Sequence, residues 1–324
     1  MPNASIPPSD FVDSLTDPGL MVDGYPQPVS LRRYLCAVPE HGGNQKAAVL
    51  QGALPGLVAG TADTGVLAPL MKSREYDMLF SGQGKPEHFR TVMAVIWRNK
   101  DKVKADSRFT KYFFDKIDVP NPLQAMVDDG LFGMDCIGFF GRYLEAAGVY
   151  SQYMGGLPRT WLDSFLPITR PYDMDVGCAL VWVHARHIAI IDSFEESNWH
   201  ANPPHAIVNI CQASNGAAHG PQTNRRVKLV RANQAAALDI AAYNEAIKKR
   251  DENGKVIGEV SEKEKEGLRT SLTSTVATGY RNGIFFDVLQ GDPAPPVRGA
   301  VYVGRLPNLN PTWLMAPRRL TPDA

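Results

Sequence analysis

The stretch from Gly133 to Gly148 constrains the fold more than any other, because it predicts a helix with a cysteine in its first turn. Asp135 is a good N-cap, since its carboxylate can accept a hydrogen bond from a backbone N–H of that turn. Glycine at position 148 is typical of a residue that ends a helix. Between them, apolar side chains recur at helical spacing: Ile137, Phe140 and Leu144.

Cys136 would lie at the start of this helix, where free N–H groups and the helix dipole favour a thiolate. Such surroundings can lower the pKa of a cysteine from about 8.5 to roughly 3.5–7.5. The alternative interpretation is a buried cysteine in an ordinary core helix. The residues that follow decide between the two, and they favour a reactive thiol.

Composition and charge exclude several classes of function. The chain has 324 residues, enough for one large domain or two ordinary ones, and its 34 Lys and Arg balance 34 Asp and Glu. This balance argues against a nucleic-acid binder or a polybasic membrane binder. Its 4 cysteines are scattered and form no Cys-x-x-Cys pair, so we expect neither a disulfide scaffold nor a structural zinc site. No metal or cofactor is implied.

The first residues lack the basic and apolar regions of a signal peptide. Ala47–Leu70 is rich in small apolar residues, but Pro55 and several glycines interrupt it, so no membrane span is expected there. We therefore expect a protein that is cytoplasmic as synthesised. If it acts elsewhere, its export would use a route that reads no N-terminal signal.

The order of patterns predicts an α+β fold in which the cysteine helix packs on an antiparallel sheet. Two helices are expected over 86–115. Strands are expected at 178–183, 187–192, 206–212, 226–230, 283–289 and 299–306. Between the strands at 226–230 and 283–289, we expect an alanine-rich helix at 233–250 and a charged excursion at 251–269. The predicted division is an extension of unknown role (1–80), a catalytic core (81–230), additions that pack on it (231–306) and a tail (307–324).

A nucleophilic cysteine needs a base and a polar group that orients the base. His187 is the best candidate base, since it opens a predicted strand and would lie at the sheet edge, where the start of a helix can meet it. His184, three residues earlier, is its main competitor. Asp192 and Asn209 are possible orienting residues.

The segment Gly133-Met-Asp-Cys-Ile-Gly-Phe139 resembles the Asp-Cys-Ser-Gly-Phe motif of the NlpC-type cysteine peptidases, which are papain-like cell-wall hydrolases. The strand His187-Ile-Ala-Ile-Ile191 resembles the family's His-Val-Gly-Ile-Tyr strand. Ile210-Cys-Gln-Ala-Ser214 resembles the strand end that carries the family's third catalytic residue. The resemblance covers residues 120–230, about a third of the chain.

The resemblance implies Cys136 as nucleophile, His187 as base and Gln212 as orienting residue. Gln124 falls at the spacing of the family's tyrosine near the oxyanion site. The chain departs from the motif at Ile137, which replaces serine, and at Gln212, which replaces histidine. A glutamine can accept the Nδ1–H of the imidazole, as asparagine does in papain-like triads, but it cannot supply charge.

A long loop that follows the cysteine helix carries two aromatic residues of interest, Tyr153 and Trp161. They could line a substrate groove or simply anchor the loop.

The implied activity is hydrolysis of an amide bond in peptidoglycan stem peptides. Without a signal peptide, this activity suggests an antibacterial effector, with a secretion-system component or an immunity protein as partners. Two alternatives stay open. One is a papain-like amidase, esterase or acyltransferase that acts on a cytoplasmic substrate. The other is a papain-like binding module whose catalytic triad has decayed.

Overall fold

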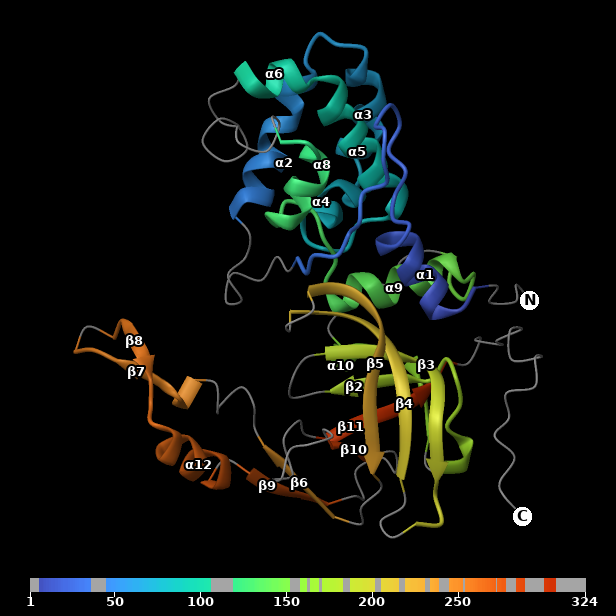
Figure 1. Cartoon of the computed structure of the whole chain (residues 1–324), viewed down its shortest axis with the longest axis vertical. Helices are drawn as coiled ribbons and strands as arrows, with labels where there is room; N and C mark the ends of the chain where they lie inside the picture. Colours follow the sequence, from blue (N-terminus) through green and yellow to red (C-terminus); the bar gives the residue numbers. More distant parts are fainter. Residues whose placement is uncertain are drawn as a thin grey trace.

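The protein consists of a group of helices and a β-barrel, with the cysteine helix between them (Figure 1). The computed structural model describes residues 6–35, 45–105, 119–151, 158–161, 164–168, 171–182, 187–201, 205–215, 219–230, 234–238, 245–252, 254–271, 273–277, 284–288 and 300–306. Within these residues the fold is mixed α+β with an antiparallel sheet, as the sequence predicts.

The helical part precedes the barrel in the sequence. Its helices are α2 (Gln45–Val58), α3 (Asp63–Met71), α4 (Arg74–Phe80), α5 (Pro86–Arg98), α6 (Lys100–Ala105) and α8 (Pro122–Asp128). Helices α4 and α5, which lie on either side of residue 80, share one buried cluster with α8. The expected boundary at residue 80 therefore falls inside a common core. Within the described residues, no helix is long and apolar enough to cross a membrane.

The barrel follows from the pairing of its strands. They are β1 (Leu166–Pro167), β2 (Ala179–Trp182), β3 (His187–Asn198), β4 (His205–Asn215), β5 (His219–Val230), β10 (Ile284–Val288) and β11 (Ala300–Arg305). Neighbours run in the order β1-β11-β10-β5-β4-β3-β2, and β11 also pairs with β2. This last pairing closes β2, β3, β4, β5, β10 and β11 into a barrel, and β1 adds to it through β11.

Alternation along the strands separates an inner from an outer face. The inner face forms one cluster, which includes Leu180, Trp182, Ala189, Ile191, Val208, Ile210, Val227, Leu229, Val301 and Val303. The residues that alternate with them point to the outer face. Ile188, Ile190 and Cys211 are examples, and they belong to the buried cluster of the helices. The barrel is thus filled by its own side chains, and the helices cover part of its outer surface.

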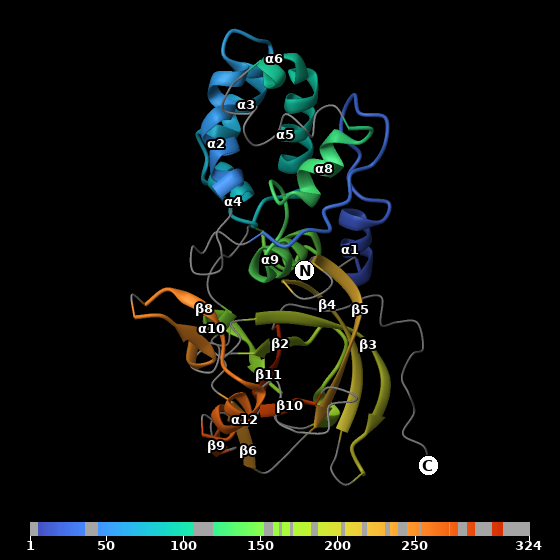
Figure 2. The same ribbon diagram turned by 60° about the vertical axis from the view of Figure 1, so that its left-hand side comes forward.

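Helices α9 (Cys136–Ala146) and α1 (Pro8–Thr16) lie between the two parts (Figure 2). Phe11 on α1 contacts Phe139 and Tyr143 on α9, with ring centroids 5.7 and 5.9 Å apart. Two short helices, α10 (Pro158–Trp161) and the 3-10 helix η3 (Pro171–Asp173), lie between α9 and β2 in the sequence.

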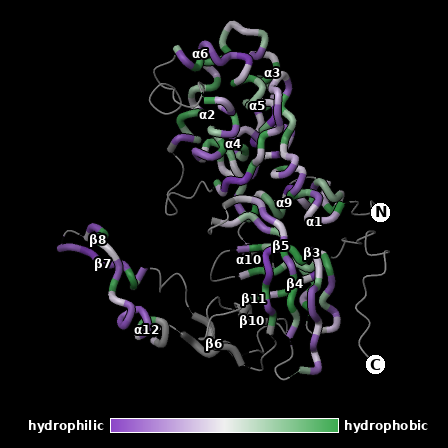
Figure 3. The backbone as a smooth tube through the Cα atoms, viewed as in Figure 1, coloured by the Kyte–Doolittle hydropathy of each residue, from purple (hydrophilic) through white to green (hydrophobic). Residues whose placement is uncertain are grey.

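An arm is inserted between β5 and β10. It contains the ribbons β6 (Gln234–Leu238) with β9 (Thr273–Ala277) and β7 (Lys248–Arg250) with β8 (Val256–Glu259), and the helix α12 (Glu262–Ser271). Figure 3 shows many hydrophilic residues along α12 and at β7 and β8.

The prediction of one helix over 233–250 is wrong for most of the described part of this segment, because 234–238 and 248–250 are strands and only residues 245–246 are helical. Each of the two strands pairs with a partner later in the chain, and this pairing outweighs the helical propensity of alanine. The expected tail, 307–324, lies outside the described residues.

Candidate active site

Cys136 is the first residue of α9, and the start of this helix is fixed by its cap. Asp135 has extended backbone angles, and its side chain accepts a hydrogen bond from the Gly138 N–H at 2.5 Å. Position 138 requires glycine, since a Cβ there would lie 2.1 Å from the Gly82 carbonyl oxygen. Residue Cys136 as a whole is 5% exposed. The predicted cap and helix are therefore present, with the thiol in a mostly buried position.

His187 and Gln212 are joined by a hydrogen bond. The imidazole Nε2 lies 2.6 Å from Oε1 of Gln212. Antiparallel pairing of β3 with β4 creates this contact, because it sets the beginning of β3 beside the end of β4. Trp182 is the cross-strand partner of His187, and the centroids of the two rings are 5.3 Å apart. Two residues 25 positions apart in the sequence thus form the pair that a base and its orienting group require.

The hydrogen bond to the side-chain amide of Gln212 determines which nitrogen of the His187 imidazole can act as a base. The Oε1 atom of Gln212 can only accept a hydrogen bond, so Nε2 of His187 must carry the proton. In the neutral ring the lone pair then lies on Nδ1. The orienting bond therefore forms at Nε2, and the expectation that it forms at Nδ1 is wrong.

The loop before Cys136 lies at the same end of the barrel as this pair. Residues 31–35, which we call the strap, contact both this loop and the start of β5. A Cβ on Gly220, at the start of β5, would lie 2.6 Å from backbone atoms of the strap, and one on Gly133 would lie 2.4 Å from the Arg33 oxygen. The Met134 N–H donates to Arg33 O at 3.0 Å. Since Gly220 pairs with Ser214 near Gln212, the strap connects this end of the barrel to the loop before Cys136.

Side-chain alternation adds a further constraint. The side chain of His187 lies on the same face of β3 as those of Ala189 and Ile191, which fill the barrel. Cys136 belongs to the cluster of the helices, which includes Ile188 and Ile190 on the opposite face of β3. Helix α9 packs on β3 and β4, the strands that carry the pair. Because His187 is the first residue of β3, it lies at the end of the barrel rather than within it.

The two alternative orienting residues have other partners. Asp192 accepts a hydrogen bond from the Ser9 N–H, at the start of α1, at 2.9 Å. The Asn209 side chain donates to the Ser193 hydroxyl at 3.3 Å. Of the three candidates, Gln212 is the one whose contact with His187 is present.

The side chain of Gln124 forms hydrogen bonds with Ser30, which precedes the strap, and with Asp128. Its Oε1 accepts from the Ser30 N–H at 2.8 Å, and its Nε2 donates to Ser30 O and to Asp128, each at 3.0 Å. These bonds give the side chain a structural role, and none of them supports a role as oxyanion donor.

Trp161 is 3% exposed and packs on Phe140 of α9, with ring centroids 5.1 Å apart. It also stacks on Phe165 at 6.2 Å. These contacts match the anchoring alternative and not a groove lining. The other predicted groove residue, Tyr153, lies outside the described residues, as does the competing base His184.

Cys178, just before β2, and Cys211, in β4, are buried, as expected of small core residues. Burial raises the pKa of Cys178 to about 11 and raises that of Cys211 further. Neither is suited to form a thiolate. Cys36 lies outside the described residues. In the part of the chain that the structure describes, no three His, Cys, Asp or Glu side chains are grouped so that they could hold a metal ion.

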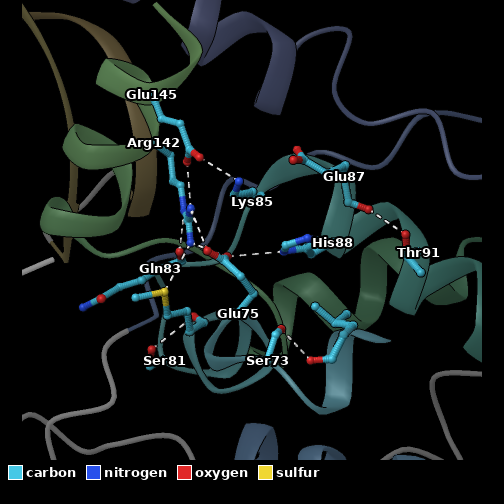
Figure 4. A network of polar contacts seen from close by, with 12 residues as sticks. Ser73, Glu75, Ser81, Gln83, Lys85, Glu87, His88, Thr91, Arg142 and Glu145 are labelled. Atoms are coloured by element: carbon cyan, nitrogen blue, oxygen red, sulfur yellow. Dashed lines mark hydrogen bonds and ion pairs between the residues drawn. The ribbon is translucent and has the colours of Figure 1, made fainter. Parts of the chain in front are cut away.

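Sequence reasoning missed a charged network behind the cysteine helix (Figure 4). Arg142 of α9, with a side chain 1% exposed, pairs with Glu75 at 2.6 Å and with Glu145 at 2.8 Å. Lys85 pairs with Glu145 at 2.7 Å, and His88 Nδ1 lies 3.4 Å from Glu75. In the sequence, Arg142 is an ordinary polar residue of a predicted helix. Its burial becomes evident only from the packing of α4 against α9.

Comparison of the chain with protein-family models, with curated proteins and with solved structures found no match. The resemblance to the NlpC-type peptidases therefore stays a prediction that depends on the motif residues and on the geometry described above.

Proposed function

We propose that the chain is a papain-like cysteine hydrolase of the NlpC type, with Cys136 as nucleophile, His187 as base and Gln212 as orienting residue. The observation that carries the proposal is the hydrogen bond of 2.6 Å between His187 Nε2 and Gln212 Oε1. It lies on the strands against which the helix of Cys136 packs. A histidine held in one tautomer by a side-chain amide is the arrangement that papain-like enzymes use.

The proposed reaction begins with transfer of the Cys136 thiol proton to His187 Nδ1. The thiolate attacks the amide carbonyl carbon, and the Cys136 N–H at the start of the helix stabilises the oxyanion. His187 then gives its proton to the leaving amine as the C–N bond breaks, which leaves a thioester. Water, deprotonated by His187, hydrolyses the thioester, so that the acid is released and the thiol is restored.

The proposed substrate is an amide bond of a peptidoglycan stem peptide, and the proposed setting is that of an antibacterial effector. The substrate is what the resemblance of residues 133–139, 187–191 and 210–214 to the family's motifs implies. Partners would be the cell wall of a target bacterium, a secretion-system component and an immunity protein.

The test is digestion of purified peptidoglycan by the wild-type protein and by Cys136→Ala, with products identified by mass spectrometry. Wild type should release peptide fragments with a new amine and a new carboxyl group, and Cys136→Ala should release none. His187→Ala should also be inactive. Cys178→Ala is the matched control, because that thiol is buried next to β2 and its loss should leave hydrolysis unchanged.

The remaining outcomes separate the alternatives. Hydrolysis of small amides or esters that depends on Cys136, with none on muropeptides, would replace the wall substrate by another acyl substrate. No hydrolysis of any of them, together with alkylation of Cys136 by iodoacetamide no faster than that of a free thiol, would overturn catalysis and favour a binding module.

A further inference from the structure

The loop between α4 and α5 connects the charged network to the cap of the cysteine helix. Its central residue is Gln83, which forms hydrogen bonds in two directions. Its carbonyl oxygen accepts from Nε of the buried Arg142 at 2.8 Å. Its side-chain Nε2 donates to Oδ2 of Asp135 at 3.2 Å. Figure 4 shows Gln83 beside Arg142 in this network.

The preceding residue strengthens the contact with the cap. Gly82 has a φ of +86° and accepts the Asp135 N–H at 2.9 Å. The loop itself is held by the Gln83 N–H, which donates to Met78 O at 2.8 Å. The position and orientation of Asp135 are therefore set by two hydrogen bonds. Its N–H donates to the Gly82 carbonyl oxygen, and its carboxyl group accepts from the Gln83 side chain.

Asp135 in turn sets where the helix begins. One carboxyl oxygen accepts the Gly138 N–H, and the other accepts the Gln83 amide. Since Asp135 is 6% exposed, water is a poor substitute for a lost partner. Loss of the Gln83 amide would free the carboxyl group to rotate, and the first turn of α9, with Cys136 in it, would shift.

We propose that Gln83 is a positioning residue for Cys136, which acts through Asp135 and transmits the packing of the helical part to the nucleophile. The proposal deepens the proposed function and rests on it for the role of Cys136. It requires no contact of Gln83 with substrate.

The test is the rate of iodoacetamide alkylation of Cys136 between pH 5 and 9, followed for the Cys136 peptide by mass spectrometry, for wild type and Gln83→Ala. The alanine variant retains the carbonyl that binds Arg142 and loses only the amide. We expect its alkylation rate at neutral pH to change by roughly tenfold, as for one lost hydrogen bond in a buried site, and the midpoint of the pH profile to move. Thermal unfolding confirms that each variant is folded.

Two further variants sharpen the result. Gln83→Glu should behave as Gln83→Ala does, and the double variant Gln83→Glu/Asp135→Asn should restore the wild-type profile, because the new amide can donate to the new carboxylate. Gln51→Ala is the matched control, since its bond to Asp77 at 2.8 Å is exposed and belongs to the same helical part. It should leave the profile unchanged.

A folded Gln83→Ala with the wild-type alkylation profile would overturn the proposal, and so would a double variant that is no better than Gln83→Glu. Alkylation needs no substrate, so its dependence on Gln83 stands or fails separately from hydrolysis. A Gln83-dependent profile without hydrolysis of peptidoglycan would sustain the positioning role while the proposed activity fails.

Discussion

Gln212 holds His187 by a hydrogen bond of 2.6 Å that joins the end of β4 to the beginning of β3. The bond fixes the imidazole with its proton on Nε2, because an amide oxygen can only accept. Four predictions follow from this pair and from the packing that surrounds it.

Gln212→Ala should release the imidazole from one tautomer. Nitrogen NMR of labelled histidine should find Nε2 protonated in wild type and a mixture of tautomers in the variant. If hydrolysis is confirmed, kcat/KM should fall about ten- to a hundredfold, as expected for loss of a hydrogen bond that orients the base. Gln222→Ala is the control, since Gln222 pairs with Gln212 across the strands and its amide donates to Ser214. An unchanged tautomer in Gln212→Ala would contradict the assigned role.

Asp135→Asn should change how stability depends on pH. Burial raises the pKa of Asp135 to about 7, against hydrogen bonds from Gly138, Gln83 and Ile137 that lower it. A raised folded-state pKa gives stability that is complete below the unfolded value of 3.8 and is lost as pH rises through about 7.

Asparagine caps a helix about as well as aspartate does and does not ionise. The free energy of unfolding of wild type, measured in urea, should therefore fall relative to Asp135→Asn by up to about 1.4 kcal/mol per pH unit between pH 5 and 7. Above that range the difference should level off. A difference that is constant from pH 5 to 8 would show that Asp135 does not titrate there.

Arg142→Met should destabilise the protein by about 3–5 kcal/mol, because it leaves the carboxylates of Glu75 and Glu145 in a partly buried site without their shared partner. Urea unfolding measures the change. The control is Arg226→Met, whose pair with Glu195 is exposed and should contribute less than about 1 kcal/mol. Equal losses for the two variants would contradict the role of burial.

Gly82→Ala should be far more costly than Gly60→Ala, although both glycines have positive φ, +86° and +72°. A Cβ at Gly82 would lie 1.9 Å from the Leu35 carbonyl oxygen, whereas one at Gly60 would meet nothing within 4 Å. Gly60→Ala should cost about 1–2 kcal/mol, the strain of a left-handed residue, and Gly82→Ala more than about 3 kcal/mol. Thermal and urea unfolding of the two variants measure the difference. Similar losses would mean that the strap moves aside.

The sequence by itself determined the local elements of the site. A capping aspartate and apolar residues at helical spacing specify α9 and place Cys136 at its start, and short runs of β-branched and other apolar residues specify β2, β3 and β4. These signals are local, since capping and periodicity depend on neighbours a few positions apart. The choice of Gln212 came from a motif, which the hydrogen bond to His187 matches.

The tertiary structure decided what depends on residues far apart in the chain. Closure of the barrel through β11 and β2, the strand at 234–238 in place of a helix, and the imidazole nitrogen that Gln212 engages all result from pairing between distant segments. The same holds for Gln83 and Arg142, whose polar side chains carry no sequence signal of burial. Their roles arise only when α4 and α9 pack together, because desolvation and hydrogen-bond geometry are properties of the assembled core.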